Sequence, residues 1–134
     1  MPAEAFIDTN VLVHLAGADE KALMAETLVA KGGTISVQVL NELTLVWRRK
    51  YGYSWDLVRE TLWSLRTLLE VSPLGVDTHD LGLSIAERYR LQIYDSLLLA
   101  SALLAGCETF LSEDLHDGLV VEGQLTIRNP YRQG

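Results

Sequence analysis

Four acidic residues lie beside apolar segments, where a carboxylate would be close to a protein core. Asp8 and Asp114 each follow a short apolar run, Glu42 borders the apolar stripe of a predicted helix, and Asp95 opens the very apolar segment 97–105. If these side chains meet, their mutual repulsion raises some of their pKa values unless cations bind between them. Clustered oxygen ligands suit hard ions such as Mg²⁺ or Mn²⁺. The residue types therefore indicate a metal-binding acidic site.

The elements that must position these acids are short apolar strands that alternate with longer helices. The pattern predicts strands at residues 5–7, 34–35, 70–72, 109–111 and 125–127, and helices at 10–17, 20–31, 37–52, 55–69, 78–90 and 95–105. This alternation is typical of a parallel sheet with helices on both faces. We therefore expect an α/β fold, a three-layer α/β/α sandwich with a short-stranded central sheet. The chain has 134 residues, which fits a single domain over residues 1–134.

The expected topology places the four acids at one edge of the sheet. Ligands of an open parallel sheet gather beyond the carboxyl ends of its strands. Two of the acids follow predicted strands, and the other two lie near the starts of predicted helices, which begin at the same edge. The four can therefore meet, and the dipole of its own helix favours the ionised form of Asp95.

Hydroxyl residues in front of three predicted helices indicate where those helices begin. Ser36 and Ser54 are favourable N-cap residues for the helices that follow them. Thr78 is expected to cap the helix at 78–90, with Asp80 in its first turn.

Each acid also has an interpretation without chemistry. Asp8 and Asp95 are suitable N-cap residues, and Glu42 is close enough in sequence to Arg48 or Arg49 to form an ion pair. Asp114 lies in a polar turn, where an acid is most often solvated. The combination of all four favours a site over these separate roles.

The charge balance restricts how this chain can bind nucleic acid. The net charge is −7, with 18 acidic against 11 basic residues, so the molecule as a whole repels a polyanion. Any such contact must therefore use bound cations or a local basic patch. The apolar run 97–107 is too short to span a membrane, and the start of the sequence does not resemble a secretory signal, so we expect a cytoplasmic protein without a membrane partner.

Four segments carry a resemblance to a known family. They occur in order over nearly the whole chain, and they are FIDTNVLVH, SVQVLNEL, IYDSLLLASAL and FLSEDLHDG. Together they resemble the four successive motifs of the PIN-domain ribonucleases, especially the VapC-type toxins of bacterial toxin–antitoxin pairs. The resemblance lies in the order and spacing of the segments, because none of them is specific alone.

The resemblance implies an endoribonuclease that depends on Mg²⁺ or Mn²⁺ and uses a metal-activated water. The acidic site carried over onto this sequence is Asp8, Glu42, Asp95 and Asp114, in which Glu42 holds a second metal ion or orients the water. The supporting residues carried over are Asn10, Ser112, which stands where the family often has Thr, and Asp117 as an auxiliary ligand. The implied partners are an RNA substrate, a cognate antitoxin and a second copy of the chain in a homodimer.

Other functions remain open within and outside the family. A housekeeping RNA-processing nuclease shares these motifs, as does a PIN fold that binds RNA or a partner without cutting, although retention of all four acids argues against the latter. A phosphoacceptor domain usually has a lysine near its late strands, whereas the lysines here are Lys21, Lys31 and Lys50. A phosphatase of the haloacid dehalogenase type would have an Asp at the position of Asn10.

The segment 47–55, WRRKYGYSW, interleaves basic and aromatic residues. Arg48, Arg49 and Lys50 are suited to phosphate contacts, and the neighbouring aromatics to base stacking. The same surface would suit an antitoxin peptide. Alternatively, the cations complement a helix C-terminus while the aromatics pack.

Overall fold

A computed structural model describes residues 5–132 of the chain. Its strands are β1 (Ala5–Ile7), β2 (Thr34–Ser36), β3 (Glu70–Ser72), β4 (Thr109–Leu111), β5 (Val120–Val121) and β6 (Leu125–Arg128). Its helices are α1 (Thr9–Leu12), the 3₁₀ helix η1 (Val13–Ala16), α2 (Glu20–Lys31), α3 (Val37–Arg49), α4 (Trp55–Leu68), α5 (Val76–Tyr89) and α6 (Ile93–Leu104).

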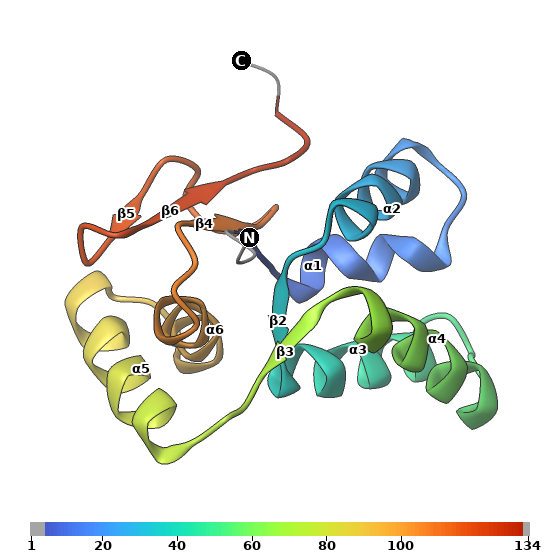
Figure 1. The fold of residues 1–134 in the computed structure, drawn as a ribbon, viewed down its shortest axis with the longest axis horizontal. Coiled ribbons are helices and arrows are strands. Elements are labelled where there is room, and N and C mark those ends of the chain that lie inside the picture. Colours follow the sequence, from blue (N-terminus) through green and yellow to red (C-terminus); the bar gives the residue numbers. More distant parts are fainter. Residues whose placement is uncertain (1–4, 133–134) are drawn as a thin grey trace.

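The described strands form one sheet with the order β3-β2-β1-β4-β6-β5. Neighbouring strands run parallel except at the β5 edge, where β5 pairs antiparallel with β6. Helices α5 and α6 lie on one side of the sheet, and α1 to α4 lie on the other (Figure 1). The predicted three-layer α/β/α fold is therefore confirmed, with a mostly parallel sheet.

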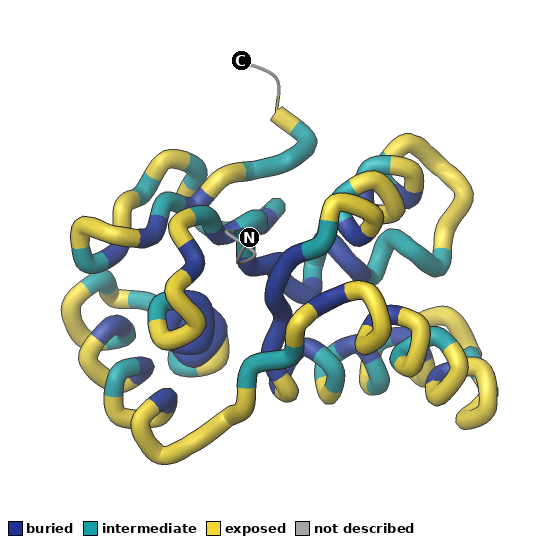
Figure 2. The backbone as a smooth tube through the Cα atoms, in the orientation of Figure 1, coloured by how far each residue is buried: buried dark blue, intermediate teal, exposed yellow. Residues whose placement is uncertain are grey.

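The central strands are apolar because both of their faces are covered. Phe6 of β1 and Phe110 of β4 are fully buried and occupy the same register position, with their rings stacked 5.3 Å apart. Ile35 of β2 and Ile127 of β6 are also fully buried. Figure 2 shows this buried centre between more exposed helices. A rigid core of this kind holds the strand ends, and the residues that follow them, in fixed positions.

Helix α6 is the helix that the other elements surround. Every residue from 96 to 102 is buried, as its apolar sequence predicts. On its outer side Gly82 of α5 lies so close that an added Cβ would stand 2.6 Å from Cδ2 of Leu97. The missing side chain therefore allows α5 and α6 to pack closely at this point.

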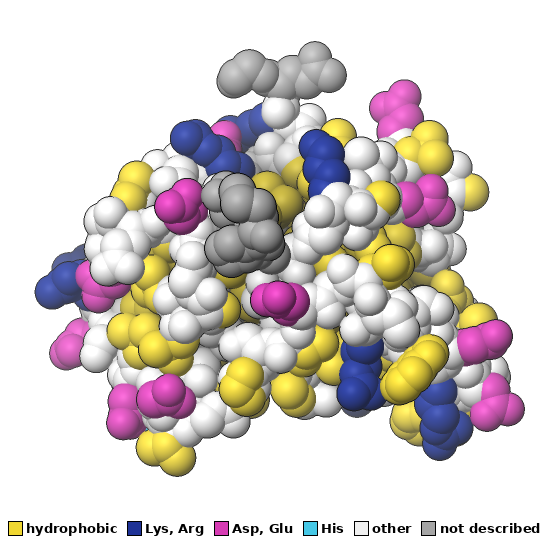
Figure 3. All heavy atoms as spheres, viewed as in Figure 1, with side chains coloured by type: hydrophobic (Ala, Val, Ile, Leu, Met, Phe, Trp, Pro, Cys, Tyr) yellow, Lys and Arg dark blue, Asp and Glu magenta, His cyan; other side chains and the backbone are white. Residues whose placement is uncertain are grey.

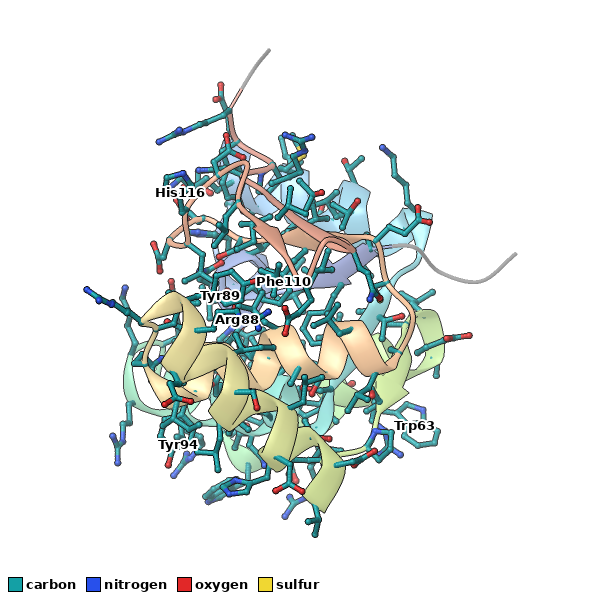
Figure 4. All side chains as sticks on the ribbon, turned by 90° about the vertical axis from the view of Figure 1, so that its left-hand side faces the viewer. Trp63, Arg88, Tyr89, Tyr94, Phe110 and His116 are labelled. Atoms are coloured by element: carbon teal, nitrogen blue, oxygen red, sulfur yellow. The ribbon has the colours of Figure 1, made fainter. Side chains whose placement is uncertain are left out.

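The C-terminal hairpin is joined to α5 by polar contacts. Arg88 donates to Oε2 of Glu122 at 2.7 Å, and the hydroxyl of Tyr89 accepts from the backbone N–H of Glu122 at 2.8 Å. Figure 4 shows Arg88 and Tyr89 at the end of α5 that approaches this hairpin. The sequence analysis did not predict β5, because a strand of two residues has too little pattern to identify.

Of the three helix starts predicted from hydroxyl residues, those after Ser36 and Ser54 agree with the structure and the third differs. Ser54 caps α4 as expected, accepting from the N–H of Leu57 at 3.1 Å. Ser36 does precede α3, but within the described residues its side chain makes no capping hydrogen bond. The helix predicted at 78–90 begins at residue 76 instead, after Gly75.

The reason for this earlier start lies in Thr78, which supports the helix from inside its first turn. Its hydroxyl accepts from the N–H of Gly75 at 3.2 Å. Asp77, and not Asp80, is therefore the acid in the first turn. Within residues 5–132, no helix combines the length and apolarity that crossing a membrane would require.

Candidate active site

The structure brings all four predicted acids to one cavity at the carboxyl edge of the sheet. Asp8 directly follows β1, Asp114 lies in the loop after β4, Glu42 belongs to α3 and Asp95 to α6. The cavity has a volume of about 440 Å³, and its walls are Asp8, Thr9, Asn10, Val13, Glu42, Leu45, Val46, Asp95 and Asp114. Four elements distant in sequence thus contribute one carboxylate each.

Asp8 is the most buried of the four acids. Its backbone N–H donates to the carbonyl of Leu111 at 2.9 Å, which continues the ladder between β1 and β4. Asp8 is 4% exposed, and its carboxylate accepts from the hydroxyl of Ser112 at 2.9 Å. Burial, together with the charges of Asp95 and Glu42, raises the pKa of Asp8 to about 7, although the Ser112 hydrogen bond acts in the opposite direction.

The capping interpretation of Asp8 is confirmed in position only. Asp8 occupies the N-cap position of α1, but its side chain makes no capping hydrogen bond to the described residues. Its carboxylate instead accepts hydrogen bonds from the side chains of Asn10 and Ser112, and Asp8 lines the cavity.

Asn10 links three of the polar groups around this cavity. Its Nδ2 lies 3.3 Å from Oδ2 of Asp8, 3.2 Å from Oγ of Ser112 and 3.2 Å from Oδ2 of Asp114. Its Oδ1 accepts from the N–H of Glu113 at 3.1 Å. One amide therefore connects the end of β1 to the loop that follows β4.

Glu42 is held by two residues that the sequence analysis did not single out. Its Oε1 accepts from the hydroxyl of Thr9 at 2.6 Å, and its Oε2 accepts from Nε2 of Gln38 at 3.0 Å. Within the described residues Glu42 forms no ion pair with Arg48 or Arg49, so that interpretation is wrong. The one sequence signal was the spacing of Gln38 and Glu42, which lie four apart on a helix.

Asp95 is the third residue of α6 and does not cap it. The cap is Gln92, whose side-chain oxygen accepts from the N–H of Tyr94 at 2.9 Å. The interpretation of Asp95 as an N-cap is therefore wrong. The helix begins at Ile93, before the predicted start at Asp95. A carboxylate in the first turn is still favoured by the helix dipole.

The loop that carries Asp114 is anchored through its neighbour. Glu113 forms an ion pair with Lys21 and a 2.9 Å contact with Nε2 of His14. Although partial burial acts to raise it, these partners hold the pKa of Glu113 below its ordinary value. No pattern in the sequence indicated this network, because its members are 92 and 99 residues apart.

Asp117 does not line the cavity. Its Oδ1 accepts from the N–H of Asn129 at 2.8 Å, and its Oδ2 lies 3.8 Å from Arg132. The structure therefore joins Asp117 to the C-terminal segment, apart from the four acids.

A comparison with protein families now agrees with this geometry. The family described as the PIN domain matches residues 5–116. The chain belongs to the PIN domain family. A search of curated proteins finds no significant sequence match.

Solved structures share the fold of this PIN domain at low sequence identity. A toxin–antitoxin complex from Klebsiella pneumoniae has a TM-score of 0.72 and 21% identity, over 96% of this chain and 99% of that one. A sarcin–ricin loop cleaving VapC toxin of Mycobacterium tuberculosis has a TM-score of 0.65 and 19% identity, over 79% and 86%. A VapBC complex from Rickettsia felis, bound to a promoter DNA fragment, has a TM-score of 0.59 and 20% identity, over 82% and 87%.

The donor set of this PIN domain suits a hard divalent cation. Within residues 5–132, no three Asp, Glu, His or Cys side chains are arranged closely enough to hold a metal ion. The four carboxylates nevertheless line one cavity, and burial raises the pKa of Asp8. A cation between these oxygens would stabilise the ionised form of Asp8, which burial disfavours.

The predicted basic segment lies at the end of α3 in this PIN domain. Arg48, Arg49 and Lys50 are exposed, and the guanidinium of Arg48 lies 4.2 Å from the ring centre of Trp55. Figure 3 shows basic side chains beside hydrophobic ones over the α3 and α4 part of the surface. A hollow of about 270 Å³ there is bounded by Thr44, Leu45, Arg48, Arg49 and Trp55. Leu45 also lines the acidic cavity, so the two hollows adjoin.

Proposed function

We propose that this PIN domain is a metal-dependent endoribonuclease, and that it is the VapC-type toxin of a type II toxin–antitoxin pair. The observation that carries the nuclease proposal is the meeting of Asp8, Glu42, Asp95 and Asp114 around one cavity. The likeness to toxin structures, one of them a toxin named for cleaving RNA, supports the assignment.

In this proposal Asp8, Asp95 and Asp114 hold Mg²⁺ or Mn²⁺, and Glu42 holds a second ion or orients the attacking water. When bound, such an ion makes water more acidic and neutralises charge on the scissile phosphate. The protein supplies no Cys, Ser or His nucleophile in this scheme. Its own contribution is to hold four carboxylates around one cavity.

Hydrogen bonds from neighbouring side chains hold the carboxylates of Asp8 and Glu42. Ser112 and Asn10 donate to Asp8, which favours its ionised form against the effect of burial. Each oxygen of Glu42 accepts one hydrogen bond and retains a lone pair for a proton of water. We therefore propose that Glu42 accepts that proton while its carboxylate stays fixed.

The partners are also proposals. We assign Arg48, Arg49 and Lys50 to contacts with the RNA or with an antitoxin. The two arginines line a hollow that adjoins the acidic cavity, and Lys50 follows them in the chain. Two of the similar structures are toxin–antitoxin complexes, which supports a cognate antitoxin for this chain. A homodimer acting in the cytoplasm, built from a single domain over residues 1–134, completes the proposal.

The decisive experiment is an RNA cleavage assay with a matched inactive variant. The purified chain is incubated with structured and unstructured RNAs in Mn²⁺, in Mg²⁺ and with chelator, beside Asp95→Asn. Cuts that require the metal and disappear in Asp95→Asn are expected. Absence of cutting on every RNA, together with no calorimetric binding of Mn²⁺, would remove the nuclease proposal. Cutting without growth inhibition on expression would leave a processing nuclease in place of a toxin.

A further inference from the structure

Gln38 is a buried amide that contacts two of the elements carrying the candidate acids. It is the second residue of α3, its side chain is 6% exposed, and its Nε2 donates to Oε2 of Glu42 at 3.0 Å. The same nitrogen donates to the backbone carbonyl of Tyr94 at 2.9 Å. Tyr94 immediately precedes Asp95 in the first turn of α6. One NH₂ group thus joins the Glu42 carboxylate to the backbone beside Asp95.

The orientation of this amide is fixed by chemistry. Both partners of Nε2 are oxygen acceptors, so a flipped amide would place its carbonyl oxygen against a carboxylate and a carbonyl. The other end of the amide, Oε1, is buried and has no hydrogen-bond partner among the described residues. A position selected only for packing would favour an apolar side chain there, because a buried polar group costs free energy. The two hydrogen bonds that Nε2 donates therefore explain why a buried amide occupies this position.

The contact with α6 depends on backbone and not on the tyrosine ring. The side chain of Tyr94 is 61% exposed and lies at the surface of the molecule (Figure 4). Gln38 is therefore bonded to the backbone at the start of α6, independently of the tyrosine side chain.

We infer that Gln38 is a positioning residue of this site, which sets the place of Glu42 relative to Asp95. The inference rests on the proposed nuclease function. Glu42 receives its other hydrogen bond from Thr9, the residue after Asp8. Gln38 and Thr9 therefore hold one oxygen of Glu42 each. Thr9 follows Asp8, and Gln38 also binds the backbone beside Asp95.

The test compares Gln38→Met, which keeps a similar volume but has no donor, with wild type. Asn41→Ala, at an exposed amide of the same helix, is the matched control. The assay uses an RNA that wild type cleaves in Mn²⁺. For Gln38→Met we expect kcat to fall about 10- to 100-fold with KM little changed. The melting temperature in chelator should stay the same or rise, and Asn41→Ala should behave as wild type.

A double-mutant cycle separates positioning from a structural role. Because Gln38 acts through Glu42, adding Gln38→Met to Glu42→Gln should change kcat by less than about twofold. If Gln38→Met keeps the kcat of wild type, the inference about Gln38 fails while the proposed nuclease function stands. A kcat loss that multiplies with that of Glu42→Gln and accompanies a lower melting temperature would also overturn the inference. If wild type neither cleaves RNA nor binds Mn²⁺, the proposed function fails, and this inference fails with it.

Discussion

The hydroxyl of Thr9 donates to Oε1 of Glu42 at 2.6 Å, across 33 residues of sequence. Thr9 is 7% exposed and follows Asp8, so this bond connects the residue beside one buried acid to a second acid on another helix. Hydrogen bonds to charged acceptors are shorter and stronger than neutral ones. The Thr9–Glu42 bond therefore fixes the carboxylate that we propose to accept a proton from water.

Thr9→Val should reduce kcat about 10-fold or more, because valine has the shape of threonine without the donor. Thr9→Ser keeps a hydroxyl and should retain most of the activity, which makes it the matched control. The measurement is RNA cleavage in Mn²⁺ under saturating substrate. Equal activity in Thr9→Val and Thr9→Ser would show that the hydroxyl has no part in positioning Glu42.

The sequence predicted the parts of this site that depend on local pattern. Asp8 and Asp114 follow short apolar runs, and those runs are buried strands whose carboxyl ends meet at one edge. The alternation of strands and helices then determined which side of the sheet the acids share. The positions of the four acids around one cavity could therefore be anticipated.

The contacts that hold the acids could not be anticipated. Thr9 and Gln38 are ordinary residue types for a helix, and the bond between Gln38 and Tyr94 spans 56 residues. Only the packing of α3 against the start of α6 reveals it. The start of α6 was misplaced for a related reason, since Gln92 is an uncommon cap and its role appears only in its bond to Tyr94.

Asp8 should make the metal-free protein less stable as the pH rises. Its pKa is raised from an unfolded value of 3.8 to about 7, so between these values the folded state binds more protons than the unfolded state. The free energy of unfolding therefore falls as the pH rises from about 4 to about 7 and does not change further above that range through this group.

Asp8→Asn removes this titration, and the asparagine oxygen can still accept from Ser112. We expect the variant to gain more stability over wild type at pH 8 than at pH 5, measured by urea unfolding in chelator. The other titrating groups are common to both proteins and cancel in the comparison. The same difference at both pH values would contradict the raised pKa of Asp8.

Mn²⁺ should raise the melting temperature of wild type, because an ion that binds only the folded state stabilises it by mass action. Asp95→Asn should show a much smaller rise, since it loses one of the proposed ligands. Thermal unfolding across a Mn²⁺ series, with chelator added back, gives the measurement. An equal rise in both proteins would place the bound ion away from Asp95.

Neutralising Arg48, Arg49 and Lys50 to glutamine should weaken RNA binding most at low salt. Each phosphate contact releases counterions from the RNA, so losing cations at the interface makes the dependence of affinity on salt less steep. Binding is measured across a salt series in the background of Asp95→Asn, the variant that we propose to be inactive. Arg88→Gln is the control, because Arg88 is ion-paired with Glu122. If the triple variant keeps the salt dependence of its parent while an antitoxin peptide no longer binds, the basic segment of α3 serves the protein partner and not the RNA.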